Sequence, residues 1–268
     1  MKKEAEQFFT LLRDEIQAFN DKQVISSESG EWIVKGFIDV FKNLYTISGD
    51  TKVISKLVEL MLFPRFMEFA NKHSFKIIPS REQNHYPDLT FIDQSGCKFA
   101  VDLKSTYRLS KDRVNTMTLG AFTGYFRNRS STKNVTFPYA EYAGHFVLGV
   151  IYSRVMVSSD EFKIRTLEEL KEIPSVIKDL LFFVQPKYRI ASDQPGSGNT
   201  KNIGAVSKLN DLASGNGSFA ALGEEAFDDY WMYYLTSDMA RAVDLESSPY
   251  KNLASYFAYK NLNSGGKK

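Results

Sequence analysis

Two aspartates and a lysine lie close together in the segment QNHYPDLTFIDQSGCKFAVDLKSTY, which spans residues 83–107. Its alternating apolar residues predict two β-strands joined by a turn, and a half-buried strand has little reason to carry charge. Two carboxylates can bind a hard divalent cation such as Mg²⁺, and an ammonium can neutralise a nearby phosphate. Asp88, Asp102 and Lys104 therefore have the chemistry needed to hydrolyse a phosphodiester. The alternative is a solvated strand edge with an ordinary Lys–Asp ion pair.

The turn between the two strands decides whether the two aspartates face each other. The sequence DQSG fits a three-residue connection with Gly96 in the left-handed conformation, which pairs Asp93 with Cys97. Counting back along both strands places Asp88 directly opposite Asp102. Two carboxylates that face each other across neighbouring strands repel unless a positive charge lies between them. The predicted register thus favours a cation between the two aspartates.

The second strand, CKFAVDLKS, has an apolar face and a charged face. Because side chains alternate along a strand, Phe99, Val101 and Leu103 point to one side and Asp102 and Lys104 to the other. We therefore expect one face of this strand to be core and the other to carry the charge.

Helices must form the rest of the framework around this hairpin. Residues 3–19 repeat apolar side chains at helical spacing and predict a surface helix. Asp50 or Thr51 can cap a second helix, which we expect Pro64 to interrupt before it continues to about residue 72. A solvated helix face is the simpler interpretation of the polar stripe on this second helix, which is formed by Lys52, Ser55, Lys56 and Glu59.

The remaining segments alternate between loops, buried strands and short helices. Residues 21–49 are too ambiguous to assign, and residues 107–135 are typical of a loop with an aromatic patch. The run HFVLGVIYSRVMV predicts a fully buried strand, and QPGSGNTKNIG at residues 194–204 predicts a loop. TLEELKEI predicts a short helix, LLFFVQPKYRIAS two strands or one strand bent at Pro186, and EEAFDDYWMYYL a helix.

The composition is that of a folded protein with a sizeable core. The chain has 268 residues, 43% of them hydrophobic, and we find no internal repeat or linker that divides it. No run approaches the ~18 apolar residues of a membrane span, and the N-terminal residues lack the apolar run of a signal peptide, so we expect a cytoplasmic protein. The single cysteine, Cys97, excludes an internal disulfide and a four-cysteine zinc site. A net charge of +2 permits a nucleic-acid partner without arguing for one.

Pro87-Asp88 and Asp102-Leu103-Lys104 together resemble the two halves of the PD-(D/E)xK nuclease signature. The similarity extends to the segments SGDTKVISKLVEL, QNHYPD, VDLKSTY and ASDQPGSGNTKNIG, which resemble, in this order, stretches of the EcoRV family of type II restriction endonucleases. Shorter matches such as FRN, FPYAEY, IYSRV and DYW extend the resemblance from about residue 48 to about residue 237.

The resemblance implies an α/β restriction-endonuclease core, with a mixed central sheet flanked by helices, in a U-shaped homodimer that holds double-stranded DNA. It implies one domain over residues 1–268, with a dimerisation part near the N-terminus and a DNA-recognition part near residues 190–205. The implied activity is Mg²⁺-dependent hydrolysis at a palindrome, with GATATC cut at its centre as the expected target. A twofold dimer suits a palindrome because each subunit reads one half-site. In the prokaryotic host, such an enzyme requires a companion DNA methyltransferase.

The resemblance also assigns roles to individual residues. Asp88 and Asp102 match metal ligands, Glu59 matches an additional acidic residue near the metal, and Lys104 matches the catalytic lysine. A glycine-flanked loop can approach base edges closely, and an Asn amide can pair with adenine. The residues that match DNA-binding positions are Gly196, Ser197, Gly198, Asn199 and Thr200 in the major-groove loop, Asn202 beside it, Gln83 and Asn84 in the minor-groove loop, and Thr51 and Ser55 on the predicted second helix.

The chain also departs from the family pattern. Residues 21–48 form a longer segment, Glu82 replaces an amide in the minor-groove loop, and the sequence diverges after Tyr234. Two other functions stay open at this point: a DNA-binding protein with a silent nuclease fold, and a repair or recombination nuclease that recognises DNA shape. The presence of all three charged motif residues favours an active enzyme, and GSGNTKN favours one that reads bases.

Overall fold

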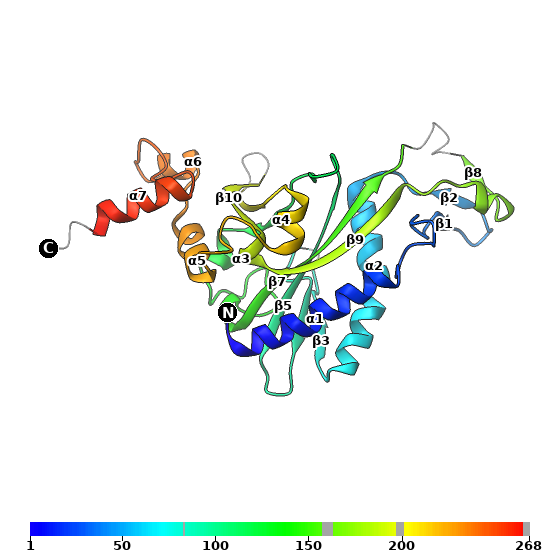
Figure 1. The fold of residues 1–268 in the computed structure, drawn as a ribbon, viewed down its shortest axis with the longest axis horizontal. Helices are drawn as coiled ribbons and strands as arrows, with labels where there is room; N and C mark the ends of the chain where they lie inside the picture. Colours follow the sequence, from blue (N-terminus) through cyan, green and yellow to red (C-terminus); the bar gives the residue numbers. More distant parts are fainter. Residues whose placement is uncertain (83, 157–162, 197–200, 265–268) are drawn as a thin grey trace.

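The computed structural model describes residues 1–82, 84–156, 163–196 and 201–264 (Figure 1). Its helices are α1 (Lys3–Asp21), α2 (Thr51–Lys72), α3 (Lys187–Ile190), α4 (Leu209–Ser214), α5 (Glu224–Tyr233), α6 (Ser237–Arg241) and α7 (Leu253–Ser264), with 3-10 helices η1 (Gly124–Phe126), η2 (Tyr139–Glu141) and η3 (Glu168–Glu172). Its strands are β1 (Gly36–Ile38), β2 (Leu44–Thr46), β3 (Lys76–Pro79), β4 (Leu89–Ile92), β5 (Lys98–Tyr107), β6 (Thr118–Ala121), β7 (Tyr142–Arg154), β8 (Ile164–Arg165), β9 (Ile177–Pro186), β10 (Ala191–Pro195) and β11 (Asn202–Ala205). Within these residues no helix is long and apolar enough to cross a lipid bilayer.

A five-stranded sheet in the order β3-β4-β5-β7-β9 forms the centre of the structure. Its neighbouring strands are antiparallel, except that β5 and β7 run parallel. A parallel pair needs a long connection, and the one between β5 and β7 contains β6, which joins a second sheet in the order β10-β11-β6. The mixed central sheet with flanking helices confirms the α/β class expected from the sequence.

Helices α1 and α2 lie against the central sheet and share one hydrophobic core with it (Figure 1). The predicted helix at residues 3–19 is confirmed as α1, which buries its apolar stripe. Phe8 of α1 stacks on Phe99 of β5 with ring centroids 4.4 Å apart. Stacked and edge-on ring pairs of this kind add to the free energy gained by burial. This core therefore fixes β5, the strand that carries Asp102 and Lys104, from one side.

The predicted interruption at Pro64 is wrong, because α2 continues without a break from residue 51 to residue 72. Asp50 caps the helix by accepting hydrogen bonds from the first backbone N–H groups. Proline removes the helical hydrogen bond to the carbonyl four residues earlier, which belongs to Leu60. Leu60 lies on the exposed side of α2, and from this we infer that water replaces the missing donor at its carbonyl.

The other side of the sheet packs on a second core, which is mainly aromatic. Ala100 of β5 belongs to this core, so the charged side of β5 is also packed, contrary to the expectation of a single core face. The stretch of β5 from Leu103 to Tyr107 lines an open cleft. The aromatic members of the second core include Tyr86, Phe122, Phe126, Tyr139, Tyr230 and Trp231.

The expected loop at residues 107–135 contains strand β6, so that prediction was wrong for residues 118–121. Asn202 and Gly204 of β11 pair with this strand. Its partner is about eighty residues away along the chain, and a strand of four residues has too little alternation to be recognised locally. The aromatic patch in the same segment is buried and includes Phe122 and Phe126.

Most other predicted elements are confirmed with adjusted types. The buried strand at residue 143 onward is β7, and the C-terminal helix at EEAFDDYWMYYL is α5. The segment around Pro186 forms two strands, β9 and β10, separated by the single turn of α3. The short helix predicted at TLEELKEI is present as the 3-10 helix η3.

The ambiguous segment at residues 21–49 contains strands β1 and β2, which form a small sheet with β8 at one end of the structure (Figure 1). Asp39 organises the turn between β1 and β2, because its carboxylate accepts hydrogen bonds from the backbone N–H groups of Phe41 and Asn43. This turn holds Val40 and Phe41 in solvent, with 90% and 82% of their surfaces exposed.

Candidate active site

Strands β4 and β5 form the hairpin that carries the predicted catalytic residues. Its register is the predicted one, since Leu89 pairs with Val101 and Gly96 takes a φ of +85° in the turn. One residue beyond this pairing, the same register aligns Asp88 with Asp102. The turn chemistry read from DQSG therefore predicted the relation of the two carboxylates correctly.

Each of the two carboxylates has a defined partner. Lys104 Nζ lies 2.7 Å from Asp102 Oδ2, and Asp88 Oδ2 accepts a hydrogen bond from the backbone N–H of Leu103 at 2.6 Å. Lys104 Nζ also donates to the carbonyl oxygen of Leu103 at 3.3 Å. Asp102 is only 6% exposed, whereas Asp88 and Lys104 line an open cleft. Asp102 thus holds the Lys104 ammonium from the interior of the protein, while the side chains of Asp88 and Lys104 face the cleft.

The charges of this group do not balance. Burial raises the pKa of Asp88 to about 7, and the neighbouring charge of Asp102 adds to the shift. Burial would lower the pKa of Lys104, but the charges of Asp102 and Asp88 outweigh it, so this pKa is raised. Two carboxylates share one ammonium, and a divalent cation can supply the missing positive charge.

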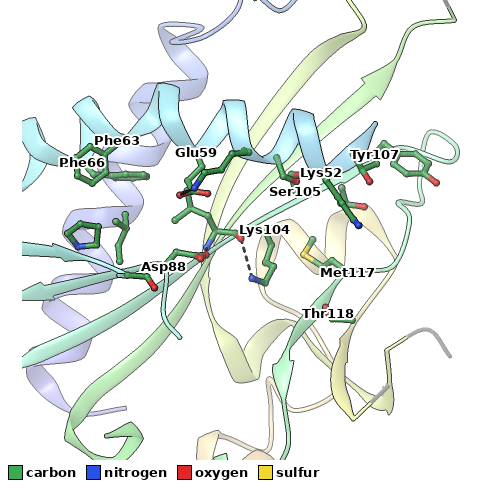
Figure 2. A pocket seen from close by; sticks show the side chains of 18 of the residues that line it. Lys52, Glu59, Phe63, Phe66, Asp88, Lys104, Ser105, Tyr107, Met117 and Thr118 are labelled. Carbon is green, nitrogen blue, oxygen red and sulfur yellow. Dashed lines mark hydrogen bonds and ion pairs between the residues drawn. The ribbon is translucent and has the colours of Figure 1, made fainter. Parts of the chain in front are cut away.

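The cleft has a volume of about 1180 Å³ and lies between α2 and the central sheet. Figure 2 shows Glu59 on the α2 side, Asp88 and Lys104 on the side of the sheet, and Thr118 across from α2. Such a cleft can accept a polyanionic strand because basic side chains are present on its walls. The charged residues that line it are Lys52, Lys56, Arg81 and Lys104, together with Glu59, Glu82 and Asp88.

The donor set suits a hard divalent cation. Mg²⁺ usually binds through one or two carboxylates, with waters and substrate phosphates completing its coordination. Asp88 and Asp102 meet this requirement. Glu59 lines the same cleft but forms an ion pair with Lys56 at 2.7 Å, and in the described part of the chain no three His, Cys, Asp or Glu side chains group closely enough to hold a metal. A metal-ligating role for Glu59 therefore stays a prediction from the sequence.

Strands β10 and β11 are the two arms of the segment expected to read base edges. Gly196 follows β10, and its backbone N–H donates to the carbonyl of Asn202 at 2.9 Å. A Cβ at Gly196 would lie 2.5 Å from Cγ2 of Thr118, so any larger residue here would displace the Thr118 side chain on β6. Thr118 also lines the cleft, so the base of this segment adjoins the cleft that Asp88 and Lys104 line. Four of the predicted base-reading residues lie outside the described residues: Ser197, Gly198, Asn199 and Thr200.

The other predicted DNA contacts are divided between the cleft and its surroundings. Thr51 and Ser55 of α2 line the cleft, and Ser55 Oγ lies 2.5 Å from Ser105 Oγ on β5. Asn84 is exposed but is not one of the cleft-lining residues. Gln83 lies outside the described residues. Thr51 and Ser55 thus share one cleft with Asp88 and Lys104, two of the predicted catalytic residues.

Several residues behind the catalytic group were not singled out from the sequence. The Tyr86 hydroxyl lies 2.9 Å from His145 Nδ1, and burial lowers the pKa of His145 well below its ordinary value. Lys187 is buried beside them among aromatic rings. A lysine inside the apolar run LLFFVQPKYRIA was the one available signal, since buried lysines are rare.

Comparison with known proteins agrees with this geometry. A family model described as "Restriction endonuclease EcoRV" matches residues 28–261. The type II restriction enzyme EcoRV of Escherichia coli is 35% identical over 232 residues, which cover 85% of this chain and 91% of that protein. The matched range contains the hairpin with the predicted catalytic residues, the cleft-lining helix α2 and the segment predicted to read bases. The chain therefore belongs to the EcoRV family of type II restriction endonucleases.

Proposed function

We propose that this endonuclease is a homodimer that hydrolyses double-stranded DNA at a short palindrome with Mg²⁺ as its cofactor. The observation that carries the proposal is the alignment of Asp88 with Asp102 beside Lys104, at the wall of a cleft that also adjoins the recognition segment. Hydrolysis of a phosphodiester requires neutralised phosphate charge, an activated water and a stabilised leaving oxygen. The two carboxylates and the ammonium provide these functions together with the cation.

Each side chain has a distinct role in this proposal. Asp88 and Asp102 would hold Mg²⁺, and the bound cation would neutralise phosphate charge and make a water molecule more acidic. Lys104 cannot ligate a cation, because its ammonium only donates hydrogen bonds. We assign it to the phosphate and the attacking water, where a fixed donor stabilises developing negative charge. Glu59 extends the negative potential of the cleft from the α2 side.

The surface that we propose for the dimer contact is the sheet formed by β1, β2 and β8 with the turn between β1 and β2. The exposed apolar side chains of this surface include Phe37, Ile38, Val40, Phe41 and Ile164. Apolar groups that gather at one end of a molecule mark an interaction surface more often than a solvated one. A twofold dimer through this end would present two identical clefts to the two halves of a palindrome.

GATATC with cleavage at its centre is the target we propose. The support is the GSGNT segment, whose Asn199 can pair in bidentate fashion with adenine in the major groove. Gly196 and Gly198 within this segment would allow a backbone to approach base edges closely. Because such an activity would also cut the host's own DNA, we propose that a companion DNA methyltransferase protects the host sites.

Incubation of the pure protein with Mg²⁺ and a long mapped duplex tests the proposal. We expect discrete fragments whose ends, once sequenced, are blunt and centred on GATATC. A smear of fragments would instead indicate a nuclease that recognises DNA shape, and no cleavage would indicate a silent DNA-binding protein. Discrete fragments with other ends would retain the site-specific activity and reject the proposed target.

A further inference from the structure

Lys187 is an unusual residue because its ammonium is buried without a hydrogen-bond acceptor. The residue is 2% exposed, and Nζ has no hydrogen-bond partner among the described residues. Burial lowers its pKa to about 8, against the opposing charge of Asp102. Burying an ammonium without an acceptor lowers the stability of the fold, so a lysine kept at such a position calls for a structural or functional explanation.

Aromatic rings surround the ammonium in place of acceptors. Nζ lies 5.1 Å from the ring centroid of Tyr86, 5.6 Å from that of Phe126 and 5.7 Å from that of Tyr139. Distances below about 6 Å are in the range of cation–π attraction, which strengthens when the cation is desolvated. The positive charge therefore holds these rings together from within the second core.

Two functional segments meet at this position. Tyr86 comes directly before Pro87 and Asp88, so the ring held by Lys187 belongs to the turn that delivers the catalytic carboxylate. Lys187 itself lies in α3, which leads directly into β10 and the recognition segment. The strand β6 is also within reach, since a Cβ built on Gly120 would lie 3.7 Å from Nζ.

We propose that Lys187 is a positioning residue whose buried ammonium clamps the Tyr86–Asp88 turn to the strands that carry the recognition segment. This proposal rests on the endonuclease activity proposed above for its kinetic consequence, but its structural consequence can be measured in the free protein. The clamp fixes Asp88 relative to the bound DNA. Its loss should therefore slow the chemical step more than it weakens DNA binding.

The decisive variant is Lys187→Met, which keeps the length of the side chain and removes the charge. An apolar side chain suits the surrounding rings, so the variant should fold and unfold cooperatively. The control is Lys22→Met, which removes a charge from an exposed site at the end of α1. If Lys187→Met does not fold, Tyr86→Leu replaces it, because this variant removes the ring that the ammonium holds.

Amide hydrogen exchange in the DNA-free protein gives the first measurement. The backbone N–H of Leu103 reports on Asp88, and that of Gly196 reports on the base of the recognition segment. We expect both amides to exchange at least tenfold faster in Lys187→Met and to be unchanged in the control. Exchange within twofold of the wild type at either amide overturns the proposal, whatever the cleavage assay shows.

Kinetics give the second measurement. With Mg²⁺ and a mapped duplex, Lys187→Met should lose at least tenfold in kcat while KM stays within threefold, and its effect should not add to that of Tyr86→Leu. Equal kcat in the variant and the wild type overturns the clamp while leaving the endonuclease intact. A wild-type protein that does not cut rejects the endonuclease proposal instead, and the exchange rates then decide on the clamp alone.

Discussion

The central five-stranded sheet and the β1–β2–β8 sheet depart from ordinary burial in opposite directions. In the first, the charged Asp102 is buried; in the second, the apolar Val40 and Phe41 are exposed. Lys104 compensates the buried charge within the same chain, whereas no residue of the described part covers the apolar turn. The proposed catalytic group thus lies within one chain, and the exposed end sheet is the surface that we propose for a second copy.

Lys104→Ala should cause the largest change in activity, because it removes the ammonium that is paired with the buried Asp102 carboxylate. We expect kcat to fall by about 10²- to 10³-fold, the usual cost of losing one fixed donor at developing charge. Binding of the metal ion should persist, since the ammonium is no ligand. Single-turnover cleavage and calorimetric titration of Mg²⁺ into the DNA complex measure the two quantities.

Lys52→Ala is the matched control, since Lys52 lines the same cleft and lies apart from Asp88 (Figure 2). It should weaken DNA binding and its salt dependence while leaving kcat close to the wild-type value. If Lys104→Ala abolishes metal binding, Lys104 has a structural role and the assignment to phosphate and water is wrong.

The double variant Val40→Ser, Phe41→Ser should weaken the proposed dimer, because it removes the exposed apolar side chains of the turn between β1 and β2. Burying two such side chains on each protomer contributes several kcal/mol to association, so the dimer dissociation constant should rise by at least about a hundredfold. Analytical ultracentrifugation over a concentration series measures it. Val243→Ser, which alters an exposed apolar residue after α6, should leave the dimer unchanged. An unaltered dissociation constant in the double variant would place the interface elsewhere.

The pH dependence of stability should show the cost of the buried carboxylates. Burial and Asp102 raise the pKa of Asp88 to about 7, so between about pH 4 and pH 7 the folded chain binds more protons than the unfolded chain. The free energy of unfolding therefore falls as the pH rises through this window. Asp88→Asn should remove this slope and be more stable than the wild type at pH 8, by roughly 2 kcal/mol.

Denaturant unfolding at pH 5 and pH 8 without metal measures the slope for both proteins. Mg²⁺ at pH 8 should recover stability in the wild type more than in Asp88→Asn, because it binds the folded state through this carboxylate. Equal slopes in the two proteins would mean that Asp88 is not the group that titrates.

Local chemistry in the sequence predicted the catalytic hairpin well. Gly96 and the length of the DQSG turn set the register, and the register alone aligns Asp88 with Asp102. Strand β6 escaped prediction because its pairing with β11 joins residues far apart in the chain. The interruption at Pro64 was predicted wrongly because the cost of proline depends on whether the freed carbonyl reaches water, which only the structure shows.

The supporting residues of the site were less predictable than its charged motif. Lys187 contacts Tyr86 only because α3 turns the chain back over the aromatic core, and no local pattern encodes that contact. Glu59 was predicted near the metal from the family resemblance, yet its ion pair with Lys56 comes from their spacing of three residues along α2. From spacing in the sequence alone, one cannot tell whether the Glu59 carboxylate binds a metal ion or pairs with Lys56.

The central claim is that Asp88 and Asp102 together hold the cation required for cleavage. Single-turnover cleavage of a mapped duplex over a range of Mg²⁺ concentrations, with wild type, Asp88→Asn and Asp102→Asn, tests it most directly. We predict that both variants bind the duplex as tightly as the wild type in the absence of metal and cut it at less than about 1% of the wild-type rate at every Mg²⁺ concentration. Cleavage by either variant at more than a few per cent of the wild-type rate would contradict the claim.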